Sequence, residues 1–361
     1  MDYDIFLYKR NRDILKNQKF SISQETLNFI LNKLPKENRA EAKKVWLSRC
    51  DQTVLDVKRE QMEVYLSSLK PFFTDEEKHI FNSLNIDILP GSSQFNASSH
   101  NKEKTVLVHE ALPHIFALFC HYFSKSSSKG KNYLTHPLAY REFIYYLVHI
   151  LIGKPIRIQS LINLNLIYPD TEEDWKYSEQ LTVACVHFVI LHELGHIKAQ
   201  DGLSRNKLEN HLMEYAADRF AFDKCMQMCV LGEEAPDLHC FAPLFALSVM
   251  SLWDYSESGT HPSTNKRIEK MKDHYRNIKG FPVEVLTYLF DFADQVIATM
   301  EFMREDFEET MDSLIEGKIV RYLDLSREAI AKKWLMTKIK NDTWEYWMGK
   351  FSPYKLNNFG I

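Results

Sequence analysis

The sequence has few of the features that mark specialised protein classes. Its 361 residues include only 11 glycines, and they contain no internal repeat and no low-complexity tract, which excludes a fibrous or disordered chain. The six cysteines contain no CxxC pair, so neither a cysteine-based metal site nor a disulfide framework is indicated. We expect the cysteines to be small buried side chains in a reducing compartment.

Long apolar runs are also missing. The longest uncharged stretches, "LTVACVHFVILH" and "CFAPLFALSVMSLW", fall short of the ~20 residues that span a bilayer. The first twenty residues mix charges throughout and lack the apolar core of a signal peptide. A net charge of −4 gives no reason to expect nucleic acid or an anionic membrane surface as a partner. We therefore expect a cytoplasmic protein with no membrane span and no nucleic-acid partner.

What the sequence does contain is a helix-rich pattern. Residues 1–85 carry apolar side chains at three- and four-residue steps, which predicts several amphipathic helices. A polar segment, 89–104, leads into a short β-branched run and then a helix. The small, polar segment 124–132 is typical of a loop. For 154–169, periodicity does not decide between strand and helix.

Two helices are expected in the middle of the chain and one long helix near its end. The first covers Ser178–Gln200, is apolar nearly all round and has Gly202 as its C-terminal cap. The second covers Leu208–Val230. The long helix runs from Pro282 to Ile315, with an apolar residue every seven positions. These apolar residues form a stripe along one side of the helix. The stripe could pack onto the helix's own domain, which we favour, or bind a regulatory partner.

A metal-binding pattern lies within "VILHELGHIKAQDG", residues 189–202. His192 and His196 are four residues apart, so a helix presents both imidazoles on one side. Glu193 lies about 100° around that helix from His192, near enough to reach a water held by the metal. This arrangement is typical of catalytic zinc, whose water loses its proton to a carboxylate. A buried helix with hydrogen-bonded histidines is the alternative.

A third ligand is needed to complete the site. The metzincin arrangement, with glycine three and histidine six residues after His196, is excluded, since Ala199 and Gly202 stand there. "ENHLMEYAADRFAFD" (209–223) offers Glu214, and small residues at 217 and 221 let its helix come close. Asp218, one turn later, is placed to hold a zinc-bound histidine.

Two further ambiguities remain at the sequence level. Glu209 is an alternative third ligand, but it lacks the face of alanines that would let the two helices approach closely. The alternative interpretation of "ExxAD" (214–218), as an ordinary helix face with surface carboxylates, also stays open. His187 is best interpreted as a satisfied core histidine, and no chemistry is assigned to three other histidines, His109, His114 and His211.

These motifs resemble metallopeptidase family forty-eight, the gluzincins that include the CaaX-prenyl and HtpX-type proteases. "HELGH", "EYAAD" and "THPSTNKRI" (260–268) occur in that family's order, and "FNASSHNKEKTVLVHEAL" (95–112) looks like its asparagine–alanine segment and edge strand. The resemblance covers about 90–275. The chain departs from the family pattern in two ways. The turn after its asparagine–alanine segment contains no glycine, and the chain has no membrane-spanning segment, whereas many members of the family are embedded in membranes. The helical flanks also give a general likeness to Lit-type phage-exclusion peptidases.

The resemblance implies a role for each matching residue. It makes His192, His196 and Glu214 the ligands of one Zn²⁺ per chain, and Glu193 the general base and acid. It places His261 and Arg267 near the site, where they would stabilise the oxyanion or anchor the substrate. For Arg267 we favour a different role, a buried ion pair with a carboxylate such as Asp218. The resemblance also implies that the substrate binds as an added β-strand alongside the strand at 96–110, which begins with Asn96 and Ala97.

We therefore expect an α+β, predominantly α protein with a gluzincin core and a small sheet. The expected parts are a helical region (1–88), the metallopeptidase core (89–280) and a second helical region (281–361). The expected function is zinc-dependent hydrolysis of a protein or peptide substrate. The alternatives are a phage-defence or toxin-like protease that stays latent until triggered, and a non-catalytic zinc-binding sensor or scaffold.

Overall fold

The computed structural model describes residues 3–34, 36–90, 95–128, 143–144, 146–147, 150, 167, 171–199, 206–231, 236–252, 258, 260–279, 281 and 283–315. Its strands are β1 (Asn85–Leu89), β2 (Ala97–His100) and β3 (Thr105–His109). Its α-helices are α1 (Tyr3–Leu15), α2 (Gln24–Lys33), α3 (Arg39–Arg49), α4 (Val54–Leu69), α5 (Asp75–Phe81), α6 (Ala111–Ser128), α9 (Glu172–Ala199), α10 (Lys207–Leu231), α11 (Pro236–Met250), α12 (Thr264–Arg276) and α13 (Val283–Ile315). Most described residues are helical, as expected, and the strands form one small sheet.

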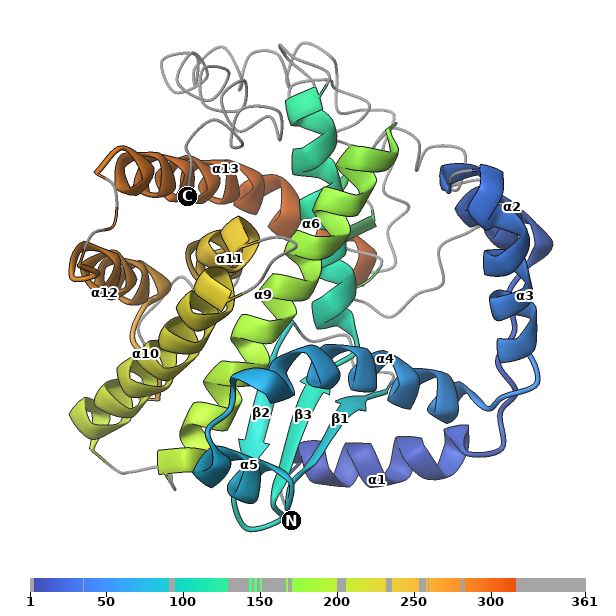
Figure 1. Cartoon of the computed structure of the whole chain (residues 1–361), viewed down its shortest axis with the longest axis horizontal. Coiled ribbons are helices and arrows are strands. Elements are labelled where there is room, and N and C mark those ends of the chain that lie inside the picture. Colours follow the sequence, from blue (N-terminus) through green and yellow to red (C-terminus); the bar gives the residue numbers. More distant parts are fainter. Residues whose placement is uncertain are drawn as a thin grey trace.

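The N-terminal helices begin where the sequence supplies caps. Thr53 and Asp56 form a capping box at the start of α4, and Thr74 and Glu77 form another at the start of α5. Helix α4 buries its apolar face against the main core. Helices α2 and α3 lie at one side of the molecule (Figure 1), and α3 buries none of its side chains. The prediction of several helices before residue 85 is confirmed.

The sheet has the order β1-β3-β2, with β1 parallel and β2 antiparallel to β3. Alternation along β3 divides the side chains between its two faces. Val106 and Val108 join the main core, while Leu107 packs with Ile5 and Tyr8 of α1.

The segment 96–110, predicted as a single substrate-pairing strand, is a hairpin. Residues 101–104 form its turn, and Lys104 adopts a φ of 48° there. The prediction was wrong on this point because the polar run "HNKEK" reverses the chain. Of the two hairpin strands, β2 lies at an edge of the sheet and β3 lies at its centre, while β1 forms the other edge.

Helix α9 runs through the middle of the molecule, between α6 and α10 (Figure 1). It starts earlier than the predicted Ser178, because Thr171 accepts a hydrogen bond from the Asp174 amide at 3.1 Å and so caps its first turn. By length and composition α9 could cross a membrane, but 83% of its most apolar 18-residue window is buried inside the protein. This burial is typical of a core helix.

Three other predictions have mixed outcomes. Residues 124–128 continue α6 rather than forming a loop, because Ser124 donates to the Asp174 carbonyl and Lys125 is buried. Helix α10 matches its predicted span to within one residue at each end. Several predicted features lie outside the described residues: the rest of the 124–132 loop, the Gly202 cap, Gln200, Pro282 and all of 154–169 but Ile167.

The apolar stripe of α13 packs onto the protein itself as far as Met303. Ala293, Val296, Met300 and Met303 are fully buried in the main core, and α13 lies against α11. The stripe beyond Met303 has no described side chains. A regulatory partner for that part stays a prediction.

A buried carboxylate ties α5 to the two helices that carry the metal-binding motifs. Glu77, only 3% exposed, accepts hydrogen bonds from Lys224 of α10 at 2.6 Å and from Lys198 of α9 at 2.8 Å. Burial alone would raise the pKa of Glu77, but the two ammonium groups and the Thr74 amide outweigh it and lower the pKa to about 2. The ionised carboxylate is therefore the form that the fold requires.

Glu77→Gln is expected to destabilise the protein at pH 7 by about 3 kcal/mol, because Lys224 keeps a buried charge without its partner. Since folding lowers the pKa of Glu77 from 4.5 to about 2, this contribution is complete above pH 4.5 and disappears as the pH falls towards 2. Denaturant unfolding at pH 7 and at pH 3 measures the difference. The exposed neighbour supplies the control, Glu76→Gln, and an equal loss in both variants would contradict the prediction.

Candidate metal centre

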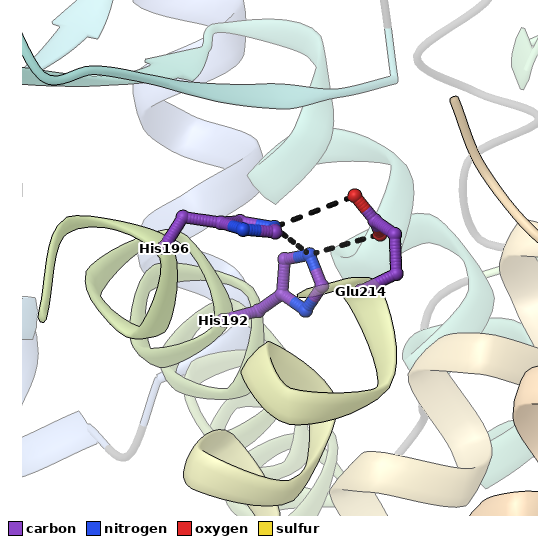
Figure 2. A group of neighbouring side chains, drawn as sticks. All are labelled: His192, His196 and Glu214. Atoms are coloured by element: carbon purple, nitrogen blue, oxygen red, sulfur yellow. Dashed lines mark hydrogen bonds and ion pairs between the residues drawn. The ribbon is translucent and has the colours of Figure 1, made fainter. Parts of the chain in front are cut away.

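Two histidines and a glutamate converge where α9 passes α10. His192 and His196 both turn their Nε2 atoms towards the Glu214 carboxylate (Figure 2), and these Nε2 atoms are 3.2 Å apart. The Glu214 oxygens lie 3.5 Å from Nε2 of His192 and 3.4 Å from Nε2 of His196. Among the described residues, no other group of His, Cys, Asp or Glu could hold a metal ion. All three residues are the ligands expected from the sequence.

Close contact between the two helices makes this convergence possible. A Cβ atom added to Gly195 would lie 2.9 Å from the Cα of Ala217 and 3.3 Å from its Cβ. Ala217 and Ala221 are buried at this contact, on the face that the sequence predicted. The glycine of "HELGH" is therefore needed for the approach of α10, which brings Glu214 within reach of the histidines.

Gly195→Ala is expected to move α10 away from α9, because the new methyl group meets backbone atoms that cannot rotate aside. We expect a loss of about 1–3 kcal/mol in the free energy of unfolding and weaker binding of a divalent metal. Denaturant unfolding and a zinc titration measure the two effects. Ala199→Gly, a change of similar size at an exposed position of α9, is the control, and unchanged metal affinity in Gly195→Ala would contradict the argument.

A buried ion pair supports the histidines from behind. Oδ1 of Asp218 lies 2.9 Å from Nδ1 of His192, the nitrogen that faces away from Glu214. Arg267 of α12 donates from Nε and Nη2 to the two oxygens of Asp218 at 2.8 and 2.7 Å. This is the ion pair that the sequence favoured for Arg267. The Asp218 carboxylate thereby fixes which imidazole nitrogen is turned to the centre.

The surroundings of the site favour positive charge at its centre. Burial lowers the pKa of His192, but contacts with Asp218 and Glu214 outweigh it and raise the pKa to about 10. For His196 the contact with Glu214 likewise outweighs burial, and its pKa is raised. Both acids stay ionised, because their histidine and arginine neighbours overcome the effect of burial: the pKa of Glu214 lies well below its usual value and that of Asp218 is about 2. The two ionised carboxylates place negative charge beside the imidazoles, which favours a cation at this position.

The donor set can be tested against zinc by its dimensions. Tetrahedral coordination with bonds of about 2.0–2.1 Å puts neighbouring ligand atoms about 3.3–3.4 Å apart. The two Nε2 atoms are 3.2 Å apart, and each faces a different oxygen of Glu214, Oε2 at 3.5 Å from His192 and Oε1 at 3.4 Å from His196. One ligand atom from each of the three residues lies within 4.8 Å of the other two. Oε2 of Glu214 is buried and accepts no hydrogen bond within the described part of the chain. The residues present therefore fit a zinc ion with two imidazole ligands and one carboxylate ligand.

The other expected site residues lie around this centre. Glu193 follows His192 on α9, is only 8% exposed and interacts electrostatically with His196 and with His109 of β3. His261, half exposed, has its Nε2 3.4 Å from Oε1 of Glu214. Asn96 and Ala97 stand at the start of β2, and Ala97 is buried while Asn96 is exposed. The edge strand β2 lies against α9.

Two residues near the site were given no role from the sequence. His211, to which no chemistry was assigned, bonds the carbonyl oxygen of Ser258 at 2.9 Å. Its position three residues before Glu214 puts it on the same side of α10, and this spacing was the signal available. Ser258 could not be found from the sequence, since its role depends on a contact between distant segments. In contrast, His187 is a core histidine as expected, bonded to His239 and Tyr65.

A family model describes the region that contains all of these residues. The model of Peptidase U49, the Lit-type peptidase family, matches residues 93–279, just over half of the chain. The chain belongs to this family. It is thus assigned to a peptidase family. Of the two resemblances noted from the sequence, the match supports the one to Lit-type peptidases. The resemblance to family forty-eight stays a prediction. No curated protein and no solved structure matches the chain.

Proposed function

We propose that this member of the Peptidase U49 family is a zinc-dependent endopeptidase. The observation that carries the proposal is the convergence of one nitrogen from each of His192 and His196 and one oxygen of Glu214, all within 4.8 Å of one another. Family membership supports peptide-bond hydrolysis, and the neighbouring Glu193 supports a catalytic role for the centre. When bound, zinc supplies the Lewis acid that makes water nucleophilic at neutral pH and polarises a carbonyl.

The protein residues then carry the proton and hold the developing charge. Glu193 is the group that takes the proton of the attacking water and later gives it to the leaving amine. His261 stands at the rim, half exposed beside Glu214, where its Nε2–H can donate to the oxyanion of the tetrahedral intermediate. Asp218 and Arg267 hold His192 and do not touch the substrate.

The substrate is proposed to bind along β2. This strand forms the edge of the sheet and lies against α9, so an extended peptide can add to it through main-chain hydrogen bonds. Asn96 and Ala97, at its start, then lie at one end of the bound peptide. Main-chain pairing of this kind implies an extended or unfolded segment of the substrate.

A phage-defence protease that stays latent until triggered is a second candidate. Its specific support is the match to the Lit-type family. The chemistry would be the same, and only the presence of a trigger distinguishes the two. A non-catalytic zinc-binding scaffold is less well supported, because a scaffold has no use for Glu193 beside the ligands.

Metal removal tests the proposal directly. The purified protein is expected to contain about one zinc per chain, and a chelator should abolish cleavage, with activity restored by added zinc but not by magnesium. Cleavage is measured by mapping new peptide termini in a host-cell extract, with and without extract from phage-infected cells. Activity only in the second extract supports the latent protease. A protein that binds no divalent metal would overturn the proposal.

A further inference from the structure

The segment that carries His261 is held to α10 at two points. Both points lie on the same side of that helix, three residues apart. At the first, Nε2 of His211 bonds the carbonyl oxygen of Ser258 at 2.9 Å. At the second, Nε2 of His261 faces Oε1 of Glu214 at 3.4 Å. The first contact joins the buried His211 to the exposed Ser258 and is partly buried, whereas in the second the His261 side chain is half exposed.

The chemistry of the first contact fixes its direction. A backbone carbonyl only accepts hydrogen bonds, so Nε2 of His211 must carry the proton and donate it. The bond is partly buried and joins α10 to the connection between α11 and α12, 47 residues away in sequence. Removing the His211 donor therefore removes this attachment of the turn to α10.

From Ser258 the constraint continues to His261 through a closed turn. The amide of Ser258 donates to the carbonyl of His261 at 3.0 Å, and the amide of His261 donates back to the Ser258 hydroxyl at 2.9 Å. These two reciprocal bonds fix the backbone of His261 relative to Ser258, and therefore relative to α10.

The imidazole itself is then oriented by Thr260, whose hydroxyl is 2.8 Å from Nδ1 of His261. Nε2 of His261 faces a carboxylate, which only accepts hydrogen bonds, so this nitrogen carries the proton. In a neutral imidazole Nδ1 then accepts, and the Thr260 hydroxyl donates to it. The turn thus presents an N–H donor at the edge of the site.

We propose that His211 is a positioning residue, which acts through Ser258 to hold His261 at the rim of the metal centre. The inference rests on the proposed function, because it assigns a purpose to the placement of His261 in peptide hydrolysis. His211 touches neither the substrate nor the three ligands in this role. It determines where the donor of His261 stands when the oxyanion forms.

The test is a double-mutant cycle between His211 and His261. His211→Leu removes the donor and is expected to lower kcat about tenfold with KM nearly unchanged, because a displaced oxyanion donor affects the transition state. In a His261→Ala background the same change should have less than a twofold effect. His211→Gln, which keeps an N–H donor at similar reach, should restore most of kcat. Gln227→Leu, at an exposed position of α10, is the matched control.

A second variant keeps the proposal testable if His211→Leu fails to fold. Ser258→Ala lies at an exposed position and removes the hydroxyl that accepts the amides of Thr260 and His261. It should lower kcat in the same direction and also lose its effect in His261→Ala. Equal losses in both backgrounds, or no loss in the wild-type background, would overturn the proposal, as would full activity of His261→Ala.

Hydrogen exchange separates this proposal from the proposed function, because it needs no activity. In the zinc-loaded protein the amides of Ser258 and His261 should exchange at least tenfold faster in His211→Leu than in the wild type, with His192 and His196 still binding one zinc. Unchanged exchange rates overturn the positioning role. An inactive wild type with this exchange pattern overturns the peptidase proposal alone.

Discussion

Glu193→Gln is expected to lower kcat for peptide cleavage by about 10²–10⁴-fold while leaving bound zinc near one per chain. Loss of a general base costs this much because the attacking water keeps its proton and the leaving amine receives none. The amide has nearly the same size as the carboxylate, and Glu193 is not one of the three converging ligands. Metal binding and folding should therefore persist.

The measurement is single-turnover cleavage of a mapped substrate beside elemental analysis of the same sample. Glu172→Gln, an exposed carboxylate at the start of the same helix, controls for the loss of one negative charge on α9. It should cleave at the wild-type rate. A Glu193→Gln protein that retains activity would remove the general base from the mechanism, and one that loses zinc would make residue 193 structural.

The second large effect is expected from Arg267→Met, which should destabilise the metal-free protein by about 3–5 kcal/mol. Arg267 is 4% exposed and neutralises Asp218 through two hydrogen bonds, and its Nη1 is also 4.0 Å from Oε2 of Glu214. Without the guanidinium two carboxylates stay buried near each other with less compensation. Asp218 is then free to turn from His192, so zinc affinity should fall about 10–100-fold.

Denaturant unfolding and competitive zinc titration measure the two effects of Arg267→Met. Arg267→Lys keeps the charge but cannot donate two parallel hydrogen bonds, and it should fall between the wild type and Arg267→Met. Lys270→Met, exposed on the same helix, should change stability by no more than about 0.5 kcal/mol. A loss below about 1 kcal/mol in Arg267→Met would show that the ion pair is not needed for the fold.

The sequence alone predicted the helix-rich fold and the pairing of His192 with His196, because both depend on short-range regularities. Residues four apart share a helix face whatever the tertiary structure, so His192 and His196 could be paired from their spacing. Alanines at 217 and 221 indicated close helix contact, and Gly195 with Ala217 provides it. The capped starts of α4 and α5 follow equally local rules.

Local patterns failed where a distant segment decided the outcome. Residues 124–128 are polar enough for a loop, yet they remain helical because Ser124 donates to the Asp174 carbonyl at the start of α9 and Lys125 is buried. The hairpin at 96–110 was taken for one strand because β-branched runs do not reveal how a sheet is ordered. Glu77 was not singled out, since its two lysine partners are more than a hundred residues away in sequence.

The amino-acid sequence by itself determined which side chains this protein can offer to a metal ion, since helical periodicity sets their direction. Only the tertiary structure decided that the Glu214 oxygens lie 3.5 and 3.4 Å from the two imidazoles, that Arg267 neutralises Asp218 behind them, and that His211 reaches the segment of His261. The physical reason is that contacts between distant segments depend on how whole helices pack, and side-chain spacing within one helix does not specify that packing.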